Sequence, residues 1–372
     1  MLKDVVIIGG GLAGLTAAIA IARAGKEVLV IEQKSYPQHK VCGEYVSNEV
    51  VSYFESLGFD VRKIQPHTVH TFRLHGPSGQ YVETQLPLGG FGLRRYTFDL
   101  ELYKYAQSLG VAFMENTKVF DVTFEDDFFE VNAKHQTKCK SKVVLGSFGK
   151  RSSLDKQLKR AFIQKPTDYF GVKFYLKKDF SKELVSLYNF EGGYGGAVLV
   201  EDGTVDVAYL ARTSTLKKYG GLEAFEQEVL NKNPAWKLLV DDAEYIWPKP
   251  MTISNISFLP KERIVNHVLM IGDAAGMIPP LVGNGMAMGI HASKLASENV
   301  LRFLDGQISR NEMELCYSKA WNKKFGSRLF WGRNLQHFMG KNHISELSIQ
   351  TLKKFPFILP LIIKQTHGQP IV

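Results

Sequence analysis

The residues that most constrain the fold lie near the N-terminus, in the uncharged run VVIIGGGLAGLTAAIAIA at positions 5–22. This run begins with four residues that favour β-strands, breaks at three consecutive glycines and continues as an alanine-rich segment typical of a helix. It nearly reaches the length of a membrane span, but the glycines interrupt it too early. The order therefore predicts a strand at Val5–Ile8, a tight turn and a helix.

The glycines of this turn have the spacing G-x-G-x-x-G, which is typical of dinucleotide binding. Gly9 permits the sharp turn, Gly11 lets a pyrophosphate approach the main chain, and Gly14 lets the helix pack closely on the strand. The helix, beginning with Leu12 and Ala13, directs its N-terminal amides and the positive end of its dipole at the phosphates. The turn is thus expected to bind a pyrophosphate.

A carboxylate follows at the expected distance from the turn. The segment VLVIE at 28–32 predicts a second strand that ends at Glu32. A carboxylate at this strand end is suited to accept hydrogen bonds from a ribose diol.

Composition narrows the classes of partner. The net charge of +9 suits a negatively charged cofactor or an anionic membrane surface, but there is no basic tail and no nucleic-acid motif. We therefore expect no nucleic-acid partner. The three cysteines form no CxxC pair and the histidines show no metal spacing, so neither a disulfide framework nor a metal site is expected. A reducing, cytoplasmic setting follows.

After Glu32 the chain does not continue the strand–helix alternation of a nicotinamide dehydrogenase. A loop at 33–48 comes first, and residues 67–88 are strand-like and aromatic. A second nucleotide-type element appears at 267–301, with a strand, Gly272-Asp273, a Pro/Gly loop and a long helix. Two elements so far apart favour a long cofactor held at both ends, as extended FAD would be.

Three ordered features resemble one group of flavoproteins: the glycine turn with Glu32, an arginine in LRRYTFDLELYKYA (93–106), and GDAA followed by P-x-x-G-x-G. The set resembles the FAD-dependent oxidoreductases that include geranylgeranyl reductases, p-hydroxybenzoate hydroxylase and flavin-dependent halogenases. It is most similar to the geranylgeranyl reductase-like proteins. The resemblance implies FAD as the cofactor.

By position, the resemblance assigns two contacts to the middle of the chain. It implies that Arg95 contacts FAD and that the main chain of Val119 contacts the adenine. In the downstream element it places a helix start beneath the flavin ring, where the helix dipole would stabilise negative charge on reduction. The FAD contacts implied there are Asp273, Gly283, Gly285 and Met286.

One motif departs from the family pattern. The family hydroxylases carry Ala-Asp-Gly-x-x-Ser after a strand, whereas VVLGSFGKRSSLD (143–155) has Phe148 in place of the aspartate. Gly149 and Ser152 remain. Because the resemblance gives this segment a role in handling NAD(P)H, the change predicts weak direct reduction by NAD(P)H. An electron-donor protein is the alternative reductant.

The order of elements predicts an α/β fold with an α+β insert. We expect a Rossmann-like FAD-binding domain, an antiparallel-sheet substrate domain and a helical C-terminus. The expected boundaries are 1–65, 90–160 and 262–305 for the FAD-binding domain, 66–89 and 161–261 for the substrate domain, and 306–372 for the helical region.

The segment NFEGGYGGAVLV (189–200) is dense in glycine and aromatic residues. Two glycine pairs around Tyr194 would let the main chain approach a planar ligand, so Tyr194 is a candidate catalytic residue. The alternative is a glycine-rich bulged hairpin with aromatic side chains in the core. The W-x-W-x-I-P signature of the halogenases is missing.

The loop HKVCGEYVS (39–47) follows the strand that bears Glu32. In the resembling reductases a cysteine followed by glycine lies near the flavin, which implies that Cys42 and Gly43 contact the cofactor. A thiol near flavin N5 could donate a proton as hydride adds to an alkene. The alternative is that Cys42 only fits a tight loop.

The C-terminal segment KKFPFILPLIIKQTHG (353–368) has an apolar stretch too short to cross a bilayer. It suits core packing, or an interfacial anchor for a lipid substrate, so the protein is expected in the cytoplasm with or without membrane contact.

The sequence predicts an FAD-dependent oxidoreductase that reduces a C=C bond of an isoprenoid or other lipophilic or aromatic molecule. The alternatives are a monooxygenase or halogenase of secondary metabolism, and a flavoprotein electron carrier.

Overall fold

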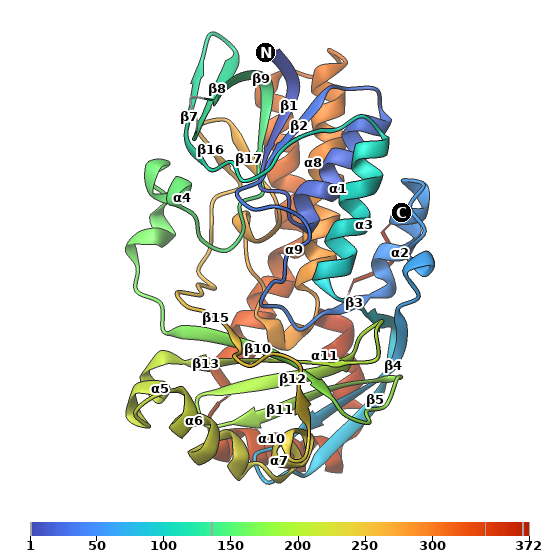
Figure 1. Cartoon of the computed structure of the whole chain (residues 1–372), viewed down its shortest axis with the longest axis vertical. Coiled ribbons are helices and arrows are strands. Elements are labelled where there is room, and N and C mark those ends of the chain that lie inside the picture. The colour runs from blue at the N-terminus through green and yellow to red at the C-terminus, as the bar shows by residue number, and fades with distance from the viewer. Residues whose placement is uncertain (1, 135–136, 339, 367, 372) are drawn as a thin grey trace.

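The computed structural model describes residues 2–134, 137–338, 340–366 and 368–371. Within the predicted C-terminal region, residues 339, 367 and 372 lie outside this description. Two β-sheets occupy the upper and lower halves of the molecule, and helices cover them (Figure 1).

The first sheet has the strand order β16-β17-β9-β1-β2-β6, with the hairpin β7–β8 joined to β9. The pairs within β17-β9-β1-β2-β6 are parallel, and β8 and β16 add antiparallel edges. β1 is central and its residues Val5–Ile8 are buried, as expected of a parallel strand covered on both faces. The strands are β1 (Leu2–Ile8), β2 (Val28–Ile31), β6 (Ala112–Met114), β7 (Val119–Glu125), β8 (Phe128–Ala133), β9 (Thr137–Gly146), β16 (Ile264–Val265) and β17 (Val268–Met270).

Four long helices accompany this sheet: α1 (Leu12–Arg23), α3 (Arg95–Ser108), α8 (Gly285–Leu304) and α9 (Arg310–Phe338). α1 packs between α3 and α8, and α9 runs beside α8 toward the second sheet (Figure 1). The small residues of α1 allow close approach, so that Ser293 Oγ on α8 donates to the carbonyl of Ala13 at 2.7 Å. This contact brings the two predicted nucleotide elements together.

The second sheet has the order β14-β10-β13-β12-β11-β4-β5-β3, with β15 added to β10. Its pairs are antiparallel except β4–β11. The strands are β3 (Tyr45–Ser47), β4 (His67–His75), β5 (Tyr81–Gly92), β10 (Tyr169–Lys177), β11 (Leu184–Phe190), β12 (Gly193–Leu199), β13 (Val205–Arg212), β14 (Glu244–Tyr245) and β15 (Met251–Ile253).

The α/β class, the Rossmann-like sheet, the antiparallel sheet and the helical C-terminal region are confirmed. The exact domain boundaries stay a prediction. Two short segments expected in the FAD-binding domain, β3 and residues 90–92 of β5, pair within the second sheet. The loop that precedes β3 therefore runs from one sheet to the other.

The remaining helices surround the second sheet and the links between the sheets. α10 and α11 pack against β5, and α10 also contacts β11. The α-helices are α2 (Val51–Ser56), α4 (Ser153–Gln157), α5 (Thr213–Lys218), α6 (Leu222–Glu228), α7 (Pro234–Val240), α10 (Asn342–Lys354) and α11 (Ile358–Thr366). The 3₁₀ helices are η1 (Asn48–Val50), η2 (Val61–Ile64), η3 (Ala161–Gln164), η4 (Leu230–Lys232), η5 (Gly272–Ala274) and η6 (Pro280–Val282).

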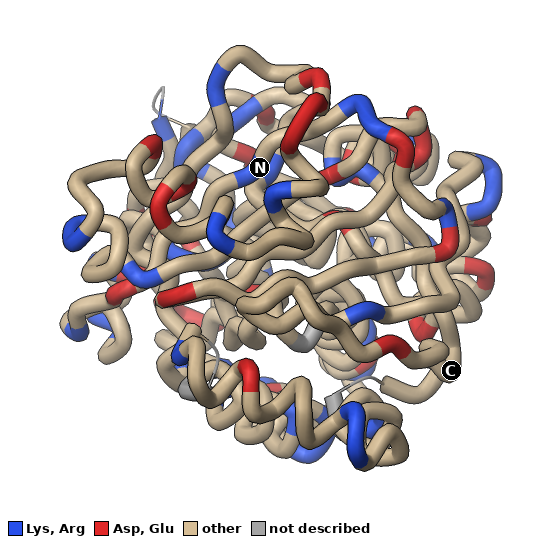
Figure 2. The backbone as a smooth tube through the Cα atoms, turned by 90° about the horizontal axis from the view of Figure 1, so that it is seen from below, with Lys and Arg blue, Asp and Glu red and all other residues tan. Residues whose placement is uncertain are grey.

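Charged residues of both signs are spread along the described chain. Figure 2 shows Lys and Arg scattered along the chain and interspersed with Asp and Glu. Among the residues described, no helix combines the length and the apolar character needed to cross a membrane.

Candidate cofactor and substrate site

A cavity of about 1390 Å³ lies between the glycine turn, the loop before β3, the start of α8 and the second sheet. Of the predicted site residues, Gly14 alone is not part of its wall. The predicted residues that line the cavity are Gly9, Gly11, Leu12, Ala13, Glu32, Cys42, Gly43, Arg95, Val119, Tyr194, Asp273, Gly283, Gly285 and Met286. Residues far apart in the chain thus share one site.

The glycine turn leaves room on the cavity side and none behind it. Gly9 has a φ of 102°, and a side chain there would strike the carbonyl of Ser147. A side chain on Gly14 would strike the carbonyl of Gly9. A β-carbon on Gly11 would instead point into open space, 3.8 Å from the Arg95 guanidinium. Gly11 also caps α1 without a side-chain hydrogen bond, so the first amides of the helix suit a phosphate.

The carboxylate of Glu32 is held rigidly at the edge of the turn. Its two oxygens accept hydrogen bonds from the main-chain N–H groups of Gly10 at 2.8 Å and Lys34 at 3.0 Å. Glu32 is buried yet lines the cavity. The remaining lone pairs of the carboxylate suit the hydroxyls of a ribose.

Arg95 is the first residue of α3 and brings a fixed positive charge to the cavity. Its guanidinium makes a two-point ion pair with the fully buried Asp99, at 2.8 and 2.7 Å. Burial by itself lowers the pKa of Arg95, but the Asp99 carboxylate outweighs this effect and the net shift is upward. The residue therefore stays charged toward an anionic ligand.

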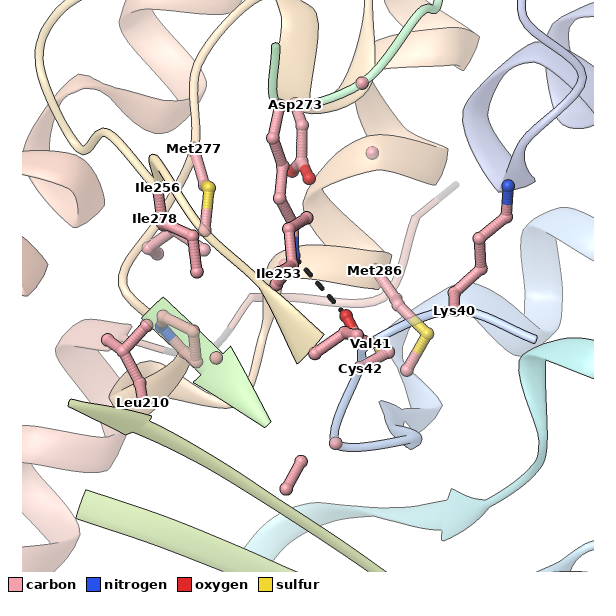
Figure 3. Close-up of a pocket in the computed structure, with 18 of the residues that line it drawn as sticks. Lys40, Val41, Cys42, Leu210, Ile253, Ile256, Asp273, Met277, Ile278 and Met286 are labelled. Carbon is pink, nitrogen blue, oxygen red and sulfur yellow. Dashed lines mark hydrogen bonds between the residues drawn. The ribbon is translucent and has the colours of Figure 1, made fainter. Parts of the chain in front are cut away.

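Cys42 lies in a tight loop against the cofactor side of the cavity. In Figure 3, Lys40, Val41 and Cys42 follow one another along this loop, and Met286 lies close by. Two residues further on, Glu44 has a positive φ of 46°, so the main chain turns sharply after Cys42. Burial raises the pKa of the Cys42 thiol, so it carries its proton at neutral pH.

Two lysines that the sequence did not single out stabilise this side of the cavity, one of them by bonding to the Cys42 loop. Lys150 Nζ donates to the carbonyl of Val41 at 3.4 Å. Lys261 Nζ donates to the carbonyls of Lys150 and Asp273, each at 2.8 Å, and burial lowers the pKa of Lys261 to about 8. The lysines carry no motif of their own. The only sequence signal was the position of Lys150 directly after Phe148-Gly149.

Tyr194 joins three parts of the cavity wall. Its hydroxyl donates to Gln336 Oε1 at 3.0 Å and accepts from the main-chain N–H of Leu281 at 2.9 Å. The ring is buried, and this burial raises the pKa of the hydroxyl. Tyr194 on β12 therefore fixes α9 and the Pro/Gly loop against the second sheet.

The remainder of the cavity is mainly apolar. Near the cofactor end the wall carries aliphatic and thioether side chains from β13, from β15 and the loop after it, and from the segment before the α8 start, including Leu210, Ile253, Ile256, Met277 and Ile278 (Figure 3). Beyond them the wall is formed by β4, β5, β11, α10 and α11, with Leu74, Leu86, Leu187, Ile344, Leu352 and Leu359. No group of three or more His, Cys, Asp or Glu side chains within the described ranges is placed to hold a metal ion.

Comparison with known proteins agrees with this geometry. A family profile described as an FAD binding domain matches residues 3–315. A digeranylgeranylglycerophospholipid reductase from Methanosarcina acetivorans is 25% identical over 341 residues, covering 87% of this chain and 81% of that protein. A menaquinone reductase from Mycobacterium tuberculosis is 25% identical over 319 residues, covering 79% and 76%. Conditioned medium factor receptor 1 from Dictyostelium discoideum is 23% identical over 373 residues, covering 90% and 70%.

Solved structures share the fold over nearly the whole chain. A geranylgeranyl bacteriochlorophyll reductase-like protein from Thermoplasma acidophilum gives a TM-score of 0.78 at 19% identity, covering 96% of this chain and 91% of that one. A halogenase crystallised with phloroglucinol and FAD gives a TM-score of 0.79 at 16% identity, covering 98% and 85%. At such identities the likeness concerns the fold alone.

Proposed function

Because this chain belongs to the FAD binding domain family and is an FAD-dependent oxidoreductase, we propose that it reduces a carbon–carbon double bond of an isoprenoid or another lipophilic molecule. Reduced FAD supplies the hydride in such a reaction. The protein must then hold the cofactor, admit an apolar substrate and deliver a proton.

The apolar arm of the cavity carries the proposal. Aliphatic side chains from β4, β5, β11, α10 and α11 line a continuation of the space that also contains the glycine turn. A small polar substrate needs no such arm, whereas a long hydrocarbon chain gains free energy as each methylene leaves water. The names of the two reductase relatives, acting on a digeranylgeranyl lipid and a menaquinone, favour a substrate of the same class.

For the cofactor, we propose the contacts expected from the sequence. The α1 amides with Gly9, Gly11, Leu12 and Ala13 would receive the pyrophosphate, and Glu32 the ribose. Arg95, Val119, Asp273, Gly283, Gly285 and Met286 would complete the site, with Gly14 supporting it from behind.

For the proton, we propose Cys42 as the donor. Its thiol is held in the loop that lines the cavity, and its raised pKa keeps the proton available at neutral pH. The hydroxyl of Tyr194 is already committed to Gln336 and Leu281, so we assign Tyr194 the shaping of the cavity.

The C-terminal segment at 353–368 is suited to contact a membrane surface. Phe357 and Leu361 are 63% and 57% exposed, and lysines flank the segment at 353, 354 and 364. Exposed apolar side chains among lysines would bind an anionic bilayer, from which a lipid substrate would enter the cavity. Co-sedimentation with anionic and neutral vesicles tests this; equal absence from both pellets contradicts it.

The central experiment mixes photoreduced enzyme with isoprenoid alkenes in the absence of oxygen. Alkene-dependent reoxidation of the flavin, with a saturated product, is expected. Reoxidation that requires oxygen and yields a hydroxylated or halogenated product would instead support the monooxygenase or halogenase. Reoxidation only by a protein acceptor would support the electron carrier.

A further inference from the structure

Three ionisable side chains without solvent exposure meet where the Cys42 loop reaches the second sheet. Lys173 Nζ on β10 lies 2.5 Å from Glu44 Oε1 and 3.1 Å from Asp206 Oδ1 on β13. All three residues are 0% exposed. The function proposed above does not use them. Burying charges costs free energy unless they are paired, so the composition of this cluster is informative.

The neighbouring arginines do not balance the cluster, because each has its own carboxylate. Arg95 is paired at two points with Asp99. Arg94 is paired with Asp202 at the β12–β13 turn. The ammonium group of Lys173 is therefore left to serve two carboxyl groups.

The remaining neighbours add no charge. The hydroxyl of Tyr175 donates to Glu44 Oε2 at 2.7 Å, and burial raises its pKa. The ring of His39 lies edge-on against Tyr175. Burial, followed by the nearby Lys173 and Arg94, lowers the pKa of His39, so this ring is neutral.

Two carboxylates with one ammonium group would leave a net negative charge in a site that water does not reach. Burial raises the pKa of Asp206, the Glu44 carboxylate raises it further, and Lys173 offsets only part of this. Glu44 also accepts hydrogen bonds from the Arg95 N–H and from Tyr175. Within the described part of the chain, Asp206 forms its one ion pair with Lys173, and both of its oxygens lack a hydrogen-bond partner; Arg94 adds a weaker favourable charge. The extra proton therefore resides on Asp206.

This cluster touches the proposed proton donor. Only Gly43 separates Glu44 from Cys42, both residues line the cavity, and the charges of Glu44 and Lys173 both act on the Cys42 thiol. We propose that Glu44, Lys173 and Asp206 form a buried proton store that restores the thiol of Cys42 after each proton donation. The proposal rests on the function proposed above for Cys42. The three residues act through the thiol, so they are positioning residues.

The step balances without a further reactant. The Cys42 S–H proton bonds to the substrate carbon, and the sulfur keeps the electron pair as a thiolate. The Asp206 O–H proton then passes by way of Lys173 and Glu44 to the sulfur. The Asp206 carboxylate left behind is paired with the Lys173 ammonium group. Between turnovers a proton from solvent refills the store by way of the cavity, which Cys42 and Glu44 both line.

The first test measures the stored proton without any catalysis. Asp206→Asn keeps the shape of the side chain and removes the acid. Unfolding constants of the FAD-bound wild type and variant are measured by denaturant titration from pH 5 to 8. Asp206 keeps its proton in the folded wild type and loses it on unfolding. The ratio of the wild-type to the variant unfolding constant should therefore rise about tenfold per pH unit, until the pH passes the pKa of the buried carboxyl. A ratio independent of pH overturns the proposal.

A matched control and a second variant keep this test decisive. The Glu191 carboxylate is held by Lys218 at 2.7 Å, which lowers its pKa, so Glu191→Gln should give a ratio that stays flat from pH 5 to 8. If Asp206→Asn does not fold, Glu44→Gln also leaves one carboxyl group for one ammonium group. It should show the same rise with pH, and a flat ratio again overturns the proposal.

The second test asks whether the store serves Cys42. In Asp206→Asn, flavin reduction should be unchanged, while substrate-dependent reoxidation in multiple turnover should fall about tenfold or more above pH 7. Its decline with pH should begin at a lower pH than in the wild type. An unchanged pH profile overturns the link to Cys42. If the wild type itself shows no substrate-dependent reoxidation, the proposed function fails, and the unfolding slope still decides whether a proton is stored.

Discussion

The two ends of the cavity are built in different ways. At the cofactor end, main-chain groups and a few fixed charges come from short segments, as in the glycine turn with Glu32. At the apolar end, aliphatic side chains come from strands and helices at opposite ends of the chain, as with Leu74 on β4 and Leu352 on α10. A rigid, charged ligand demands particular backbone shapes and so leaves a motif. A hydrocarbon chain demands only apolar volume, and leaves none.

The largest expected effect lies at the cofactor end. In Gly11→Leu, the side chain would enter the open space in front of the α1 amides, where a pyrophosphate would lie. FAD binding should be lost, while the melting temperature of the FAD-free protein should change little. Flavin fluorescence after denaturation of the purified protein measures the bound FAD.

Gly326→Ala on α9 is the control, because nothing lies within 4 Å of an added β-carbon there. It should keep its FAD. If Gly11→Leu retained FAD at the wild-type level, the glycine turn would not be the pyrophosphate site, and the contrast between the two ends of the cavity would fail.

The next largest effect is expected at Cys42, where the cofactor end and the apolar end of the cavity meet. In Cys42→Ser, the hydroxyl is a much weaker acid than the thiol, so flavin reduction should stay normal while alkene-dependent reoxidation slows about 10²-fold or more. Anaerobic stopped-flow absorbance separates the two steps. Cys316→Ser, which alters a cysteine outside the cavity wall, should behave as wild type. Equal reoxidation in Cys42→Ser would mean that Cys42 only fits its loop.

A smaller effect is expected at the apolar end. Leu347 on α10 lines the cavity yet is 63% exposed, so Leu347→Asp should fold normally. A carboxylate there should cost the bound substrate about 1.4 kcal/mol, which is about tenfold in KM, with FAD affinity unchanged. Leu238→Asp on α7, where the leucine is 73% exposed and away from the cavity, should leave KM alone. A similar rise in KM in both variants would show that the apolar arm does not bind the substrate.

The smallest effect concerns the one departure from the cofactor motif. We expect NADPH to reduce the wild-type flavin slowly and without saturation, because Phe148 replaces the aspartate of the resembling hydroxylases. Phe148→Asp should increase this rate only a few-fold, since one carboxylate does not rebuild a binding site. Stopped-flow reduction at increasing NADPH concentrations measures both. Fast, saturable reduction of the wild type would remove the case for another electron donor.

The sequence predicted what depends on neighbours along the chain. The order of elements, the FAD cofactor and the geranylgeranyl reductase-like kinship are confirmed by the fold and by the family match. The roles of the individual site residues remain predictions, although nearly all of them line one cavity. Glu44 lies in the very loop that the sequence singled out, but no role was predicted for it.

The sequence did not predict the buried cluster, because contacts between distant parts of the chain create it. Glu44, Lys173 and Asp206 belong to a loop and two strands that meet only after both sheets form. A charged residue in an antiparallel strand normally faces water, so alternation alone gives no reason to place Lys173 inside. The contacts of Lys150 and Lys261 could not be predicted for the same reason. Each ammonium group donates to the main-chain carbonyl of a residue far away in the sequence.

The strand order of the first sheet has a consequence for synthesis on the ribosome. β1 leaves the exit tunnel long before its neighbour β9, which ends at residue 146, and before the covering helix α8, which begins at residue 285. Until then the apolar run Val5–Ile8 of the nascent chain has β2 on one side but lacks β9 on the other, so apolar surface that chaperones recognise stays open. The most recognisable stretch of this protein therefore depends on segments made much later, and an N-terminal fragment that carries the whole glycine motif but ends before β9 has only part of its sheet.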